Sequence, residues 1–387
     1  MSRREVNRPG SGTEAHLGRG QRLTLIASGL LTALAGVLVA VGASPVARFI
    51  VAGLALDGLA AVVGQAIDQI GERLGPGPTG LLQSTLGNLP ELFVGIFALR
   101  AGLTGVVRAA LVGSVLGNAV LVLGLAFLAG GLRHGTQRFT AEEPRLNASL
   151  LMLVVAALLV PTLASRLSTP AAAHAGQLSD VLAIVLLIVY GASIPYYLRR
   201  SPRPDPGDGP PGAGGDPGRD GGSEAQGEPD EPVAALPLRW SAAILAFGSL
   251  AAALVSDWFV SPLEAATRTL GLSQTFTGLV VVAVASNAVE HAVGVRFAWK
   301  AKPEYAISTT LNSPLQVALL LTPVLVLVSN AVGPAKLTLV FPPLLVAALA
   351  ISTTVVTVII YDGEYTWIEG VALIALYFIL AAAFWWG

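Results

Sequence analysis

Two otherwise apolar stretches of the sequence each carry a carboxamide and a carboxylate three residues apart. Asn88 and Glu91 lie in the first stretch, and Asn287 and Glu290 lie in the second, where His291 follows directly. A carboxylate inside a membrane is costly to insert, so it usually binds an ion or carries protons. No Lys or Arg lies within the apolar part of either stretch, and Arg100, Arg296 and Lys300 lie only near the ends. We therefore expect the two glutamates to bind a cation instead of forming ion pairs.

Each glutamate stretch is followed by a second apolar segment with small polar side chains. Ser114 and Asn118 are four residues apart and Ser313 and Gln316 are three apart, so each pair shares one helix face. Oxygen donors of these kinds suit Ca²⁺, which takes about 6–8 oxygen ligands, better than Zn²⁺ or Cu²⁺. The predicted cation ligands are Glu91, Glu290, Asn88, Asn287, Ser114, Asn118, Ser313 and Gln316. Taken singly, the neutral side chains also fit a role in helix–helix packing.

The composition indicates the environment in which these residues work. The chain has 387 residues, of which 53% are hydrophobic and only 12% are charged, and its mean hydropathy is +0.70. Soluble domains carry about 25% charged residues, so we expect an integral membrane protein. A net charge of −1 without a basic patch gives no sign of a nucleic-acid partner. The absence of cysteine excludes disulfides and thiolate metal sites.

Eleven apolar segments, each near the roughly 20 residues that span a bilayer, predict an all-α membrane protein. They are placed at about 23–43, 46–66, 79–100, 104–130, 146–165, 178–198, 238–260, 275–299, 304–330, 337–360 and 366–386. The first segment is longer than the apolar core of a signal peptide, which has about 7–15 residues, so we expect it to remain as a helix.

Polar segments divide the chain. Residues 1–22 predict a disordered cytoplasmic tail, and the acidic, Pro- and Gly-rich stretch 199–236 predicts a disordered cytoplasmic linker. Lys and Arg are more frequent in the loops on the side of the tail and linker, which places the C-terminus outside. A bacterial inner membrane is the expected location. Regulatory Ca²⁺ binding by the linker stays open.

A repeat organises the membrane part. Asn88 and Glu91 precede Asn287 and Glu290 by the same 199 residues, and Ser114 and Ser313 keep this offset. An odd number of predicted helices, five, separates equivalent positions, so the copies are inverted in the membrane, as is typical of transporters with a site at the repeat interface. We therefore expect one extra N-terminal helix, 23–43, followed by five-helix repeats over 46–198 and 237–387.

Prolines and a glycine interrupt the signature segments. Pro90 removes a backbone donor one residue before Glu91, and Gly87 and Pro314 loosen their own helices. Carbonyl groups freed at such breaks are ready cation ligands where they line a cavity.

Four segments together carry a resemblance to a known family. They read GNLPELFVGIFALRAG, GSVLGNAVLVLGLAFLAGGLR, SDWFVSPLE and SNAVEHAVGVRFA. The chain resembles the calcium/proton exchanger family of the calcium/cation antiporter superfamily from about residue 46 to 386, most closely over 81–132 and 255–327. The resemblance implies that Glu91 and Glu290 bind the transported ion. Pro90 before Glu91 is closer to the sodium/calcium branch, Ser286 stands where the family has Gly, and His291 favours the proton branch.

The resemblance also implies a mechanism, which is exchange of Ca²⁺ for H⁺ by alternating access. Glu91 and Glu290 would bind either Ca²⁺ or protons, and His291 would relay or sense protons or else form a helix–helix hydrogen bond. Ca²⁺ and H⁺ are then transported ions, the lipid bilayer is the partner, and no cofactor is expected. Oligomeric state stays open.

Three other functions are weighed against this one. A Na⁺-driven exchanger is the near alternative. A cation channel is less compatible with an inverted repeat. An intramembrane enzyme is disfavoured because the sequence contains neither H-E-x-x-H nor G-x-S-x-G, and has no second membrane-embedded His.

Overall fold

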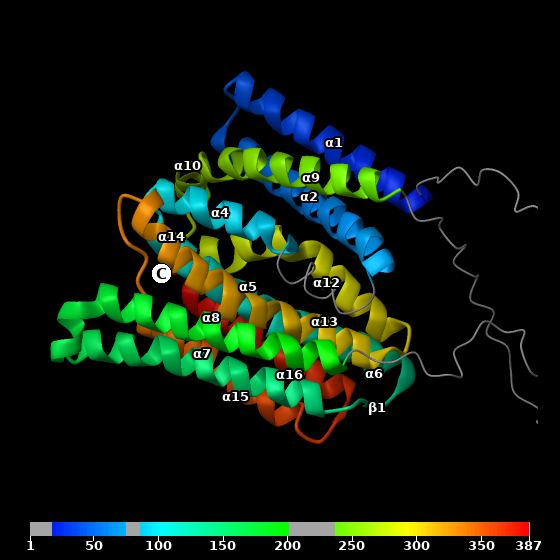
Figure 1. Cartoon of the computed structure of the whole chain (residues 1–387), viewed down its shortest axis with the longest axis vertical. Coiled ribbons are helices and arrows are strands. Elements are labelled where there is room, and N and C mark those ends of the chain that lie inside the picture. The colour runs from blue at the N-terminus through cyan, green and yellow to red at the C-terminus, as the bar shows by residue number, and fades with distance from the viewer. Residues whose placement is uncertain (1–17, 75–85, 201–236, 387) are drawn as a thin grey trace, which may run out of the picture.

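A computed structural model describes residues 18–74, 86–200 and 237–386, which are almost entirely helical (Figure 1). The first half comprises α1 (Arg19–Ala40), α2 (Pro45–Leu74), α4 (Leu89–Arg100), α5 (Thr104–Leu116), the π-helical turn η1 (Gly117–Val122), α6 (Leu123–His134), strand β1 (Gln137–Arg138), α7 (Glu142–Arg166), the short 3₁₀ turn η2 (Pro170–His174) and α8 (Ala175–Arg200). The second half comprises α9 (Leu238–Val260), α10 (Leu263–Thr269), α11 (Gln274–Phe276), the π-helical turn η3 (Thr277–Val282), α12 (Ala283–Trp299), α13 (Pro303–Gln316), the π-helical turn η4 (Val317–Leu321), α14 (Thr322–Val332), α15 (Pro343–Ile359), strand β2 (Glu364–Tyr365) and α16 (Trp367–Trp385).

The predicted all-α membrane architecture is confirmed, whereas the number of spans is not. Within the described residues, eight helices are long and apolar enough to cross a membrane. A further pair, Gln274–Asn287 and His291–Trp299, passes together but is bent by 63°, and Pro343–Ile359 is shorter. The predicted segment 79–100 starts among residues outside the described part, and its described helix α4 begins at Leu89. Eleven spans therefore stay a prediction.

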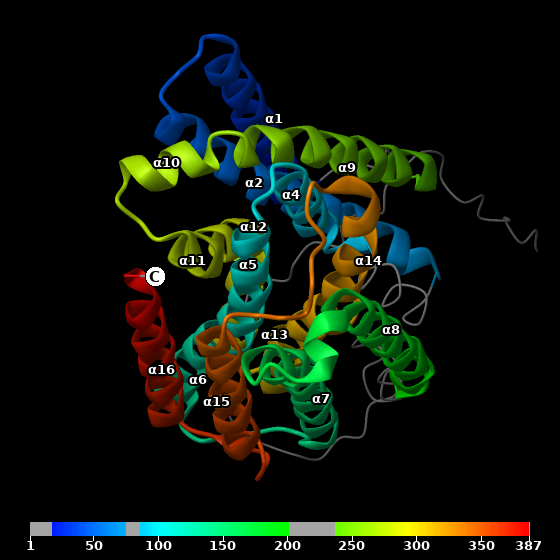
Figure 2. The ribbon, with the colours of Figure 1, turned by 90° about the vertical axis from the view of Figure 1, so that its left-hand side faces the viewer.

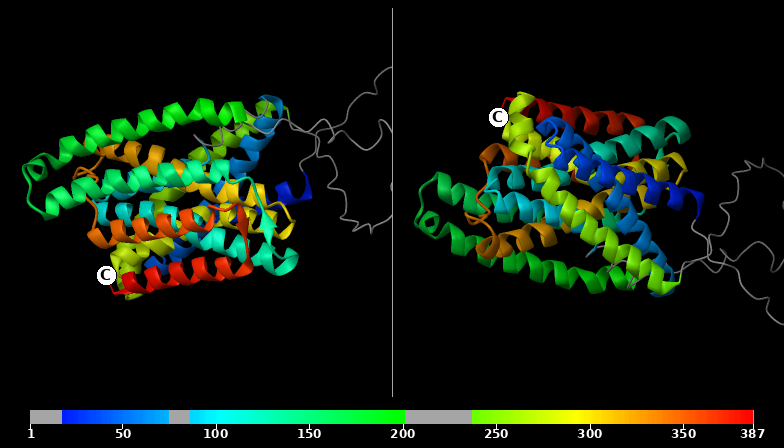
Figure 3. Two further views of the ribbon diagram at one scale, coloured as in Figure 1. Left: turned by 90° about the horizontal axis from the view of Figure 1, so that it is seen from below. Right: turned by 90° about the horizontal axis from the view of Figure 1, so that it is seen from above.

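The helices lie in three layers and run between two ends of the molecule. Figure 1 shows α1, α2 and α9 in one layer, α4, α5, α12, α13 and α14 in the middle, and α6, α7, α8, α15 and α16 on the other side. Figure 2 shows the same grouping, and Figure 3 shows the long helices running between the two ends. In the most apolar part of the span Thr104–His134, which starts with α5, 83% of the residues are buried, against 11% in the outer helix Gly20–Ala40. We call the end where α8 stops and α9 starts the linker end, and the opposite end the far end.

Several predicted boundaries shift in the structure. Helix α1 already begins at Arg19, where Gly18 N–H donates to Gln21 Oε1 at 3.2 Å, so the predicted tail is too long by four residues. Helix α2 continues to Leu74 because Gln69 and Ile70 keep its buried face past the predicted end at 66. The tail 1–17 and most of the predicted linker, 201–236, lie outside the described residues.

The segment between α14 and α15 departs from the predicted helix 337–360. Residues 333–342 form an extended strap across the far end, and α15 begins only at Pro343. Pro342 and Pro343 explain the late start, since proline disfavours a helical residue before it and is tolerated in the first turn. Alternate strap amides donate to hydroxyls of other helices, with Leu339 N–H to Ser179 Oγ at 2.9 Å and Phe341 N–H to Thr162 Oγ1 at 3.1 Å.

The linker end is tied across the two halves by a short two-stranded sheet. Gln137 pairs with Tyr365 and Arg138 with Glu364 in antiparallel register. The ring of Tyr365 stacks on Phe127 with centroids 4.0 Å apart, and burial raises the pKa of Tyr365 to about 12. The pairing of β1 with β2 joins the α6–α7 connection to the α15–α16 connection.

Candidate functional site

Glu91 is held at the start of α4. Gly87 and Asn88 form a turn, and Pro90 fits the first helical turn, where an N–H would have no intrahelical acceptor. Glu91 thus lies at a helix N-terminus, whose partial positive charge favours a carboxylate. Its side chain is only 9% exposed. The local sequence therefore places one carboxylate deep in the molecule beside a helix break.

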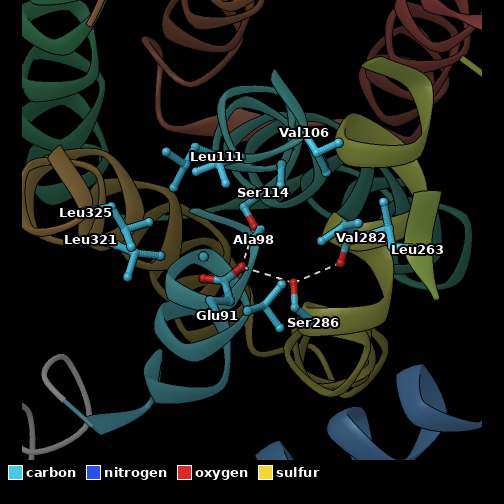
Figure 4. A pocket seen from close by; sticks show the side chains of 14 residues that line it. Glu91, Ala98, Val106, Leu111, Ser114, Leu263, Val282, Ser286, Leu321 and Leu325 are labelled. Atoms are coloured by element: carbon cyan, nitrogen blue, oxygen red, sulfur yellow. Dashed lines mark hydrogen bonds between the residues drawn. The ribbon is translucent and has the colours of Figure 1, made fainter. Parts of the chain in front are cut away.

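The two oxygens of Glu91 have different surroundings (Figure 4). Oε1 accepts hydrogen bonds from Ser114 Oγ, from Asn287 Nδ2 at 2.6 Å and from Ser286 Oγ at 3.2 Å. Oε2 is buried and has no hydrogen-bond partner among the described residues. Because all the donors are neutral, the Glu91 carboxylate is oriented without being charge-compensated by them.

A second layer of amides and hydroxyls joins the two halves of the chain behind Glu91. Asn287 Nδ2 also donates to Ser114 Oγ at 2.8 Å. Asn118 Nδ2 contacts Asn287 Oδ1 at 3.4 Å and Ser313 Oγ at 3.1 Å. Asn118 and Asn287 are 1% and 3% exposed. Helices α4 and α5 of the first half and α12 and α13 of the second half thus meet in one polar network.

Asn88 and Gln316, two of the remaining predicted ligands, contact each other. Asn88 Nδ2 donates to Gln316 Oε1 at 3.0 Å, beside the network and also between the two halves. Glu290 belongs to α12, but its side chain lies outside the described residues. His291 starts the second arm of the bent helix, and its Nε2 lies 3.8 Å from where a Cβ on Gly117 would be. The imidazole therefore faces η1, next to Asn118.

Two cavities of very different character reach Glu91. Toward the linker end lies a cavity of about 490 Å³. Apolar residues of α2 and α12 line part of it, and its polar lining includes Asp68, Asn88, Asn312 and Gln316. Toward the far end lies a pocket of about 30 Å³ whose other lining is almost wholly apolar. Glu91 and Ser286 line both cavities. The carboxylate is thus reached by a wide polar route on one side and a narrow apolar one on the other.

The far-end side is narrow because two helices cross backbone to backbone. A Cβ on Gly113 of α5 would collide with the carbonyl oxygen of Leu279 in η3. On the facing helix, a Cβ on Gly278 would lie 2.6 Å from the carbonyl oxygen of Val106. Only glycine permits such an approach. The crossing of α5 with η3 therefore leaves no room for a side chain between these two helices on the far-end side of Glu91.

The π-helical turns lie next to the site residues. η1 follows Ser114 and contains Asn118, and η4 follows Ser313 and Gln316. These turns end at Val122 and Leu321, which are again 199 residues apart. Such turns frequently occur at functional sites. The apolar pattern of the sequence gives no sign of these turns.

One further hydrogen-bond partner of Glu91 was not among the predicted site residues. Ser286 stood out in the sequence only as a departure from the family's Gly, yet its hydroxyl contacts the carboxylate and lines both cavities. Its position directly before Asn287 was the available signal.

The sequence is similar to those of known membrane exchangers. The sequence matches the family described as sodium/calcium exchanger protein over residues 44–198 and 240–386. It is 38% identical over 351 residues to the Ca²⁺/H⁺ antiporter of Synechocystis sp. (strain PCC 6803), covering 87% of this chain and 90% of that protein. It is 32% identical over 341 residues to the Ca²⁺/H⁺ antiporter ChaA of Bacillus subtilis, covering 84% and 88%.

A solved structure has the same fold. The structure of native YfkE superposes with a TM-score of 0.76 at 28% sequence identity, covering 94% of this chain and 99% of that one. The likeness therefore extends through both halves of the membrane part.

Proposed function

Because this integral membrane protein belongs to the sodium/calcium exchanger protein family, we propose that it exchanges Ca²⁺ for H⁺ by alternating access. Ca²⁺ and H⁺ are then its transported substrates. The proposal follows the relatives at 38% and 32% identity, which are named Ca²⁺/H⁺ antiporters. These names also favour a transporter over an intramembrane enzyme.

The observation that carries this proposal is the burial of the Glu91 carboxylate without a charged partner in the described part of the chain. Its carboxylate is buried, its Oε2 has no hydrogen-bond partner among the described residues, and its donors are all neutral. A buried charge of this kind is costly unless it gains a proton or a cation. The same group therefore serves both ions, and each excludes the other.

We assign the ion site to the eight predicted ligands, with Glu91 and Glu290 supplying the charge. Ca²⁺ prefers oxygen ligands, and the Asn287 carboxamide donates to Glu91 through Nδ2. A half-turn of that carboxamide would present Oδ1, since one amide carries both a donor and an acceptor. Glu91, Glu290 and His291 are the groups assigned to proton coupling.

The two cavities support alternating access. The polar cavity gives access to Glu91 from the linker end, while the crossing at Gly113 closes the far end. In the opposite state the openings would be reversed, as expected for inverted repeats over 46–198 and 237–387 that follow the helix 23–43. The equal 199-residue spacing of site residues and of the ends of η1 and η4 supports this division.

The linker end is assigned to the cytoplasm, with the C-terminus outside, and a bacterial inner membrane is the proposed location. The bias of Lys and Arg toward the linker end supports this orientation. Since the chain has no cysteine, single cysteines at Gly135 and Gly102 would be labelled from opposite sides by an impermeant maleimide. Labelling of Gly102→Cys from the cytoplasmic side would contradict the assignment.

Flux in sealed proteoliposomes tests the exchange reaction. Ca²⁺ uptake is expected when a pH gradient is imposed, and an equal Na⁺ gradient is expected to drive little uptake. A collapse of uptake on adding a protonophore is the matched control. Na⁺-driven uptake at an equal or greater rate would assign the protein to the sodium-coupled alternative, and uptake without any gradient dependence would indicate a channel.

A further inference from the structure

A polar stripe on α13 leads from the linker end to the ion site. Glu304, Ser308, Asn312 and Gln316 recur every fourth residue and so share one helix face. The last three line the polar cavity, and Gln316 accepts a hydrogen bond from Asn88, close to Glu91. The side of the cavity that α13 forms therefore offers oxygen atoms at three successive turns.

Glu143 in the first turn of α7 faces this stripe. Its Oε1 accepts hydrogen bonds from Ser308 Oγ at 3.1 Å and from Asn312 Nδ2 at 3.2 Å. One helical turn further, Asn147 Nδ2 donates to Asn312 Oδ1 at 2.7 Å. Two residues of α7 thus hold one carboxamide of α13 and fix a carboxylate against the cavity wall.

Glu143 is held by neutral donors, as Glu304 is by Thr140, whereas other carboxylates near the helix ends form ion pairs. Asp180 pairs with Lys336 at 2.5 Å and Glu364 pairs with Arg138 at 3.0 Å. Within the described part of the chain, Glu143 forms no salt bridge with a basic residue and is held by neutral donors. Glu143 itself is not among the residues that line the cavity, but both of its donors are, so its negative charge lies one side chain away from a cation that passes Ser308 and Asn312.

We propose that Glu143, with the oxygens of Ser308 and Asn312, forms a capture site that binds a divalent cation before it reaches Glu91. This inference rests on the proposed function and adds a step on its route. Carboxylate, hydroxyl and amide oxygens are ligands that Ca²⁺ accepts. One carboxylate instead of two makes the site weaker than the ion site, and weak binding suits a passing ion because the ion must also leave.

Substitution of Glu143→Gln tests this role, because glutamine keeps the shape and the acceptor oxygen but removes the charge. For Ca²⁺ offered at the linker end, we expect KM to rise about tenfold, as loss of one attractive charge close to a divalent ion implies. The maximal rate and detergent Tm are expected to stay near wild type. The matched control is Glu142→Gln, which removes the same charge from the neighbouring exposed position and should leave KM unchanged.

Asn312→Asp provides the opposite change by adding a second carboxylate to the capture site. We expect a lower KM together with a slower maximal rate, since the ion is held longer. A purely structural role predicts that both variants lower the maximal rate and Tm together, and that result would overturn the capture site. A wild-type KM in Glu143→Gln would overturn it as well.

Direct binding separates this inference from the proposed function. In detergent, a variant with both Glu91→Gln and Glu290→Gln lacks the two charges of the main site, and we expect it to retain weak ⁴⁵Ca²⁺ binding in equilibrium dialysis. Adding Glu143→Gln should remove that residual binding. Residual binding that survives the triple substitution contradicts the capture site even if exchange is confirmed, whereas its loss supports the site whatever ion drives transport.

Discussion

Helices α5 and α13 occupy equivalent places in the two proposed repeats, yet they present opposite chemistry on the same face. Every fourth residue along this face of one helix corresponds to a residue 199 positions later in the other. In the first repeat they are Gly105, Ala109 and Gly113 of α5 and Gly117 of η1, and in the second they are Glu304, Ser308, Asn312 and Gln316 of α13. The α5 face packs at Gly113 against the backbone of η3, while the α13 face lines the polar cavity.

The two routes to Glu91 are therefore lined by different kinds of residue. The small residues of α5 let backbones touch, so the far end closes by packing and leaves only a narrow apolar pocket. The polar residues of α13 keep their side of the site lined with oxygen and nitrogen atoms even where it is open. A mechanism with two chemically equivalent gates is therefore not expected here.

The largest expected effect comes from the point where the two repeats are alike. Glu91→Gln and Glu290→Gln should each lower exchange at least about a hundredfold, some 3 kcal/mol of barrier, because each removes a charge and a proton-binding group. Similar losses in both variants would support equal roles for the two repeats. ⁴⁵Ca²⁺ uptake is the measurement, with detergent Tm as the control for folding. A folded variant of either kind that exchanges near the wild-type rate contradicts the two-carboxylate site.

A smaller effect is expected at the crossing that only α5 forms. Gly113→Ala places a methyl group against the carbonyl of Leu279, which should destabilise the closed far end by about 1–3 kcal/mol and slow exchange about tenfold. Detergent Tm and uptake rate are to be measured together. The matched control is Gly105→Ala, since nothing lies within 4 Å of a Cβ there. Equal behaviour of the two variants would show that the crossing does not limit transport.

The smallest effect is expected from a substitution that makes α13 more like α5. Ser308→Ala introduces the residue found at the equivalent position, Ala109, and removes one hydrogen bond to Glu143. We expect a loss of about 1 kcal/mol in stability and no more than about a threefold rise in the KM for Ca²⁺. Denaturation curves and the concentration dependence of uptake measure both. A rise as large as that expected for Glu143→Gln would mean that the hydroxyl, and not the charge, dominates capture.

The sequence was informative wherever a long apolar pattern or a repeated spacing was present. Glu91, Ser114 and Asn287 were predicted from their types and offsets, and the structure brings them together. Glu143 was missed because an acidic residue in the first turn of a helix is ordinary. Its role depends on contacts with α13, more than 160 residues away, which periodicity cannot indicate.

Local backbone form was harder to predict for a different reason. The strap residues Leu337, Leu339 and Phe341 are buried, so their apolar pattern merges with that of the following helix. The pair Pro342–Pro343 was the one available signal for the boundary. The π-helical turns insert into otherwise regular helices, and apolar periodicity does not distinguish them.

The strap also has a consequence for the order in which the chain can complete its fold. Its acceptors Thr162 and Ser179 precede Phe341 and Leu339 by 179 and 160 residues, so they leave the ribosome first. The second half, made by itself, would leave these amide groups without their hydroxyl acceptors in an apolar environment, at a cost. The strap is thus expected to pack during synthesis onto helices of the first half that have already been made.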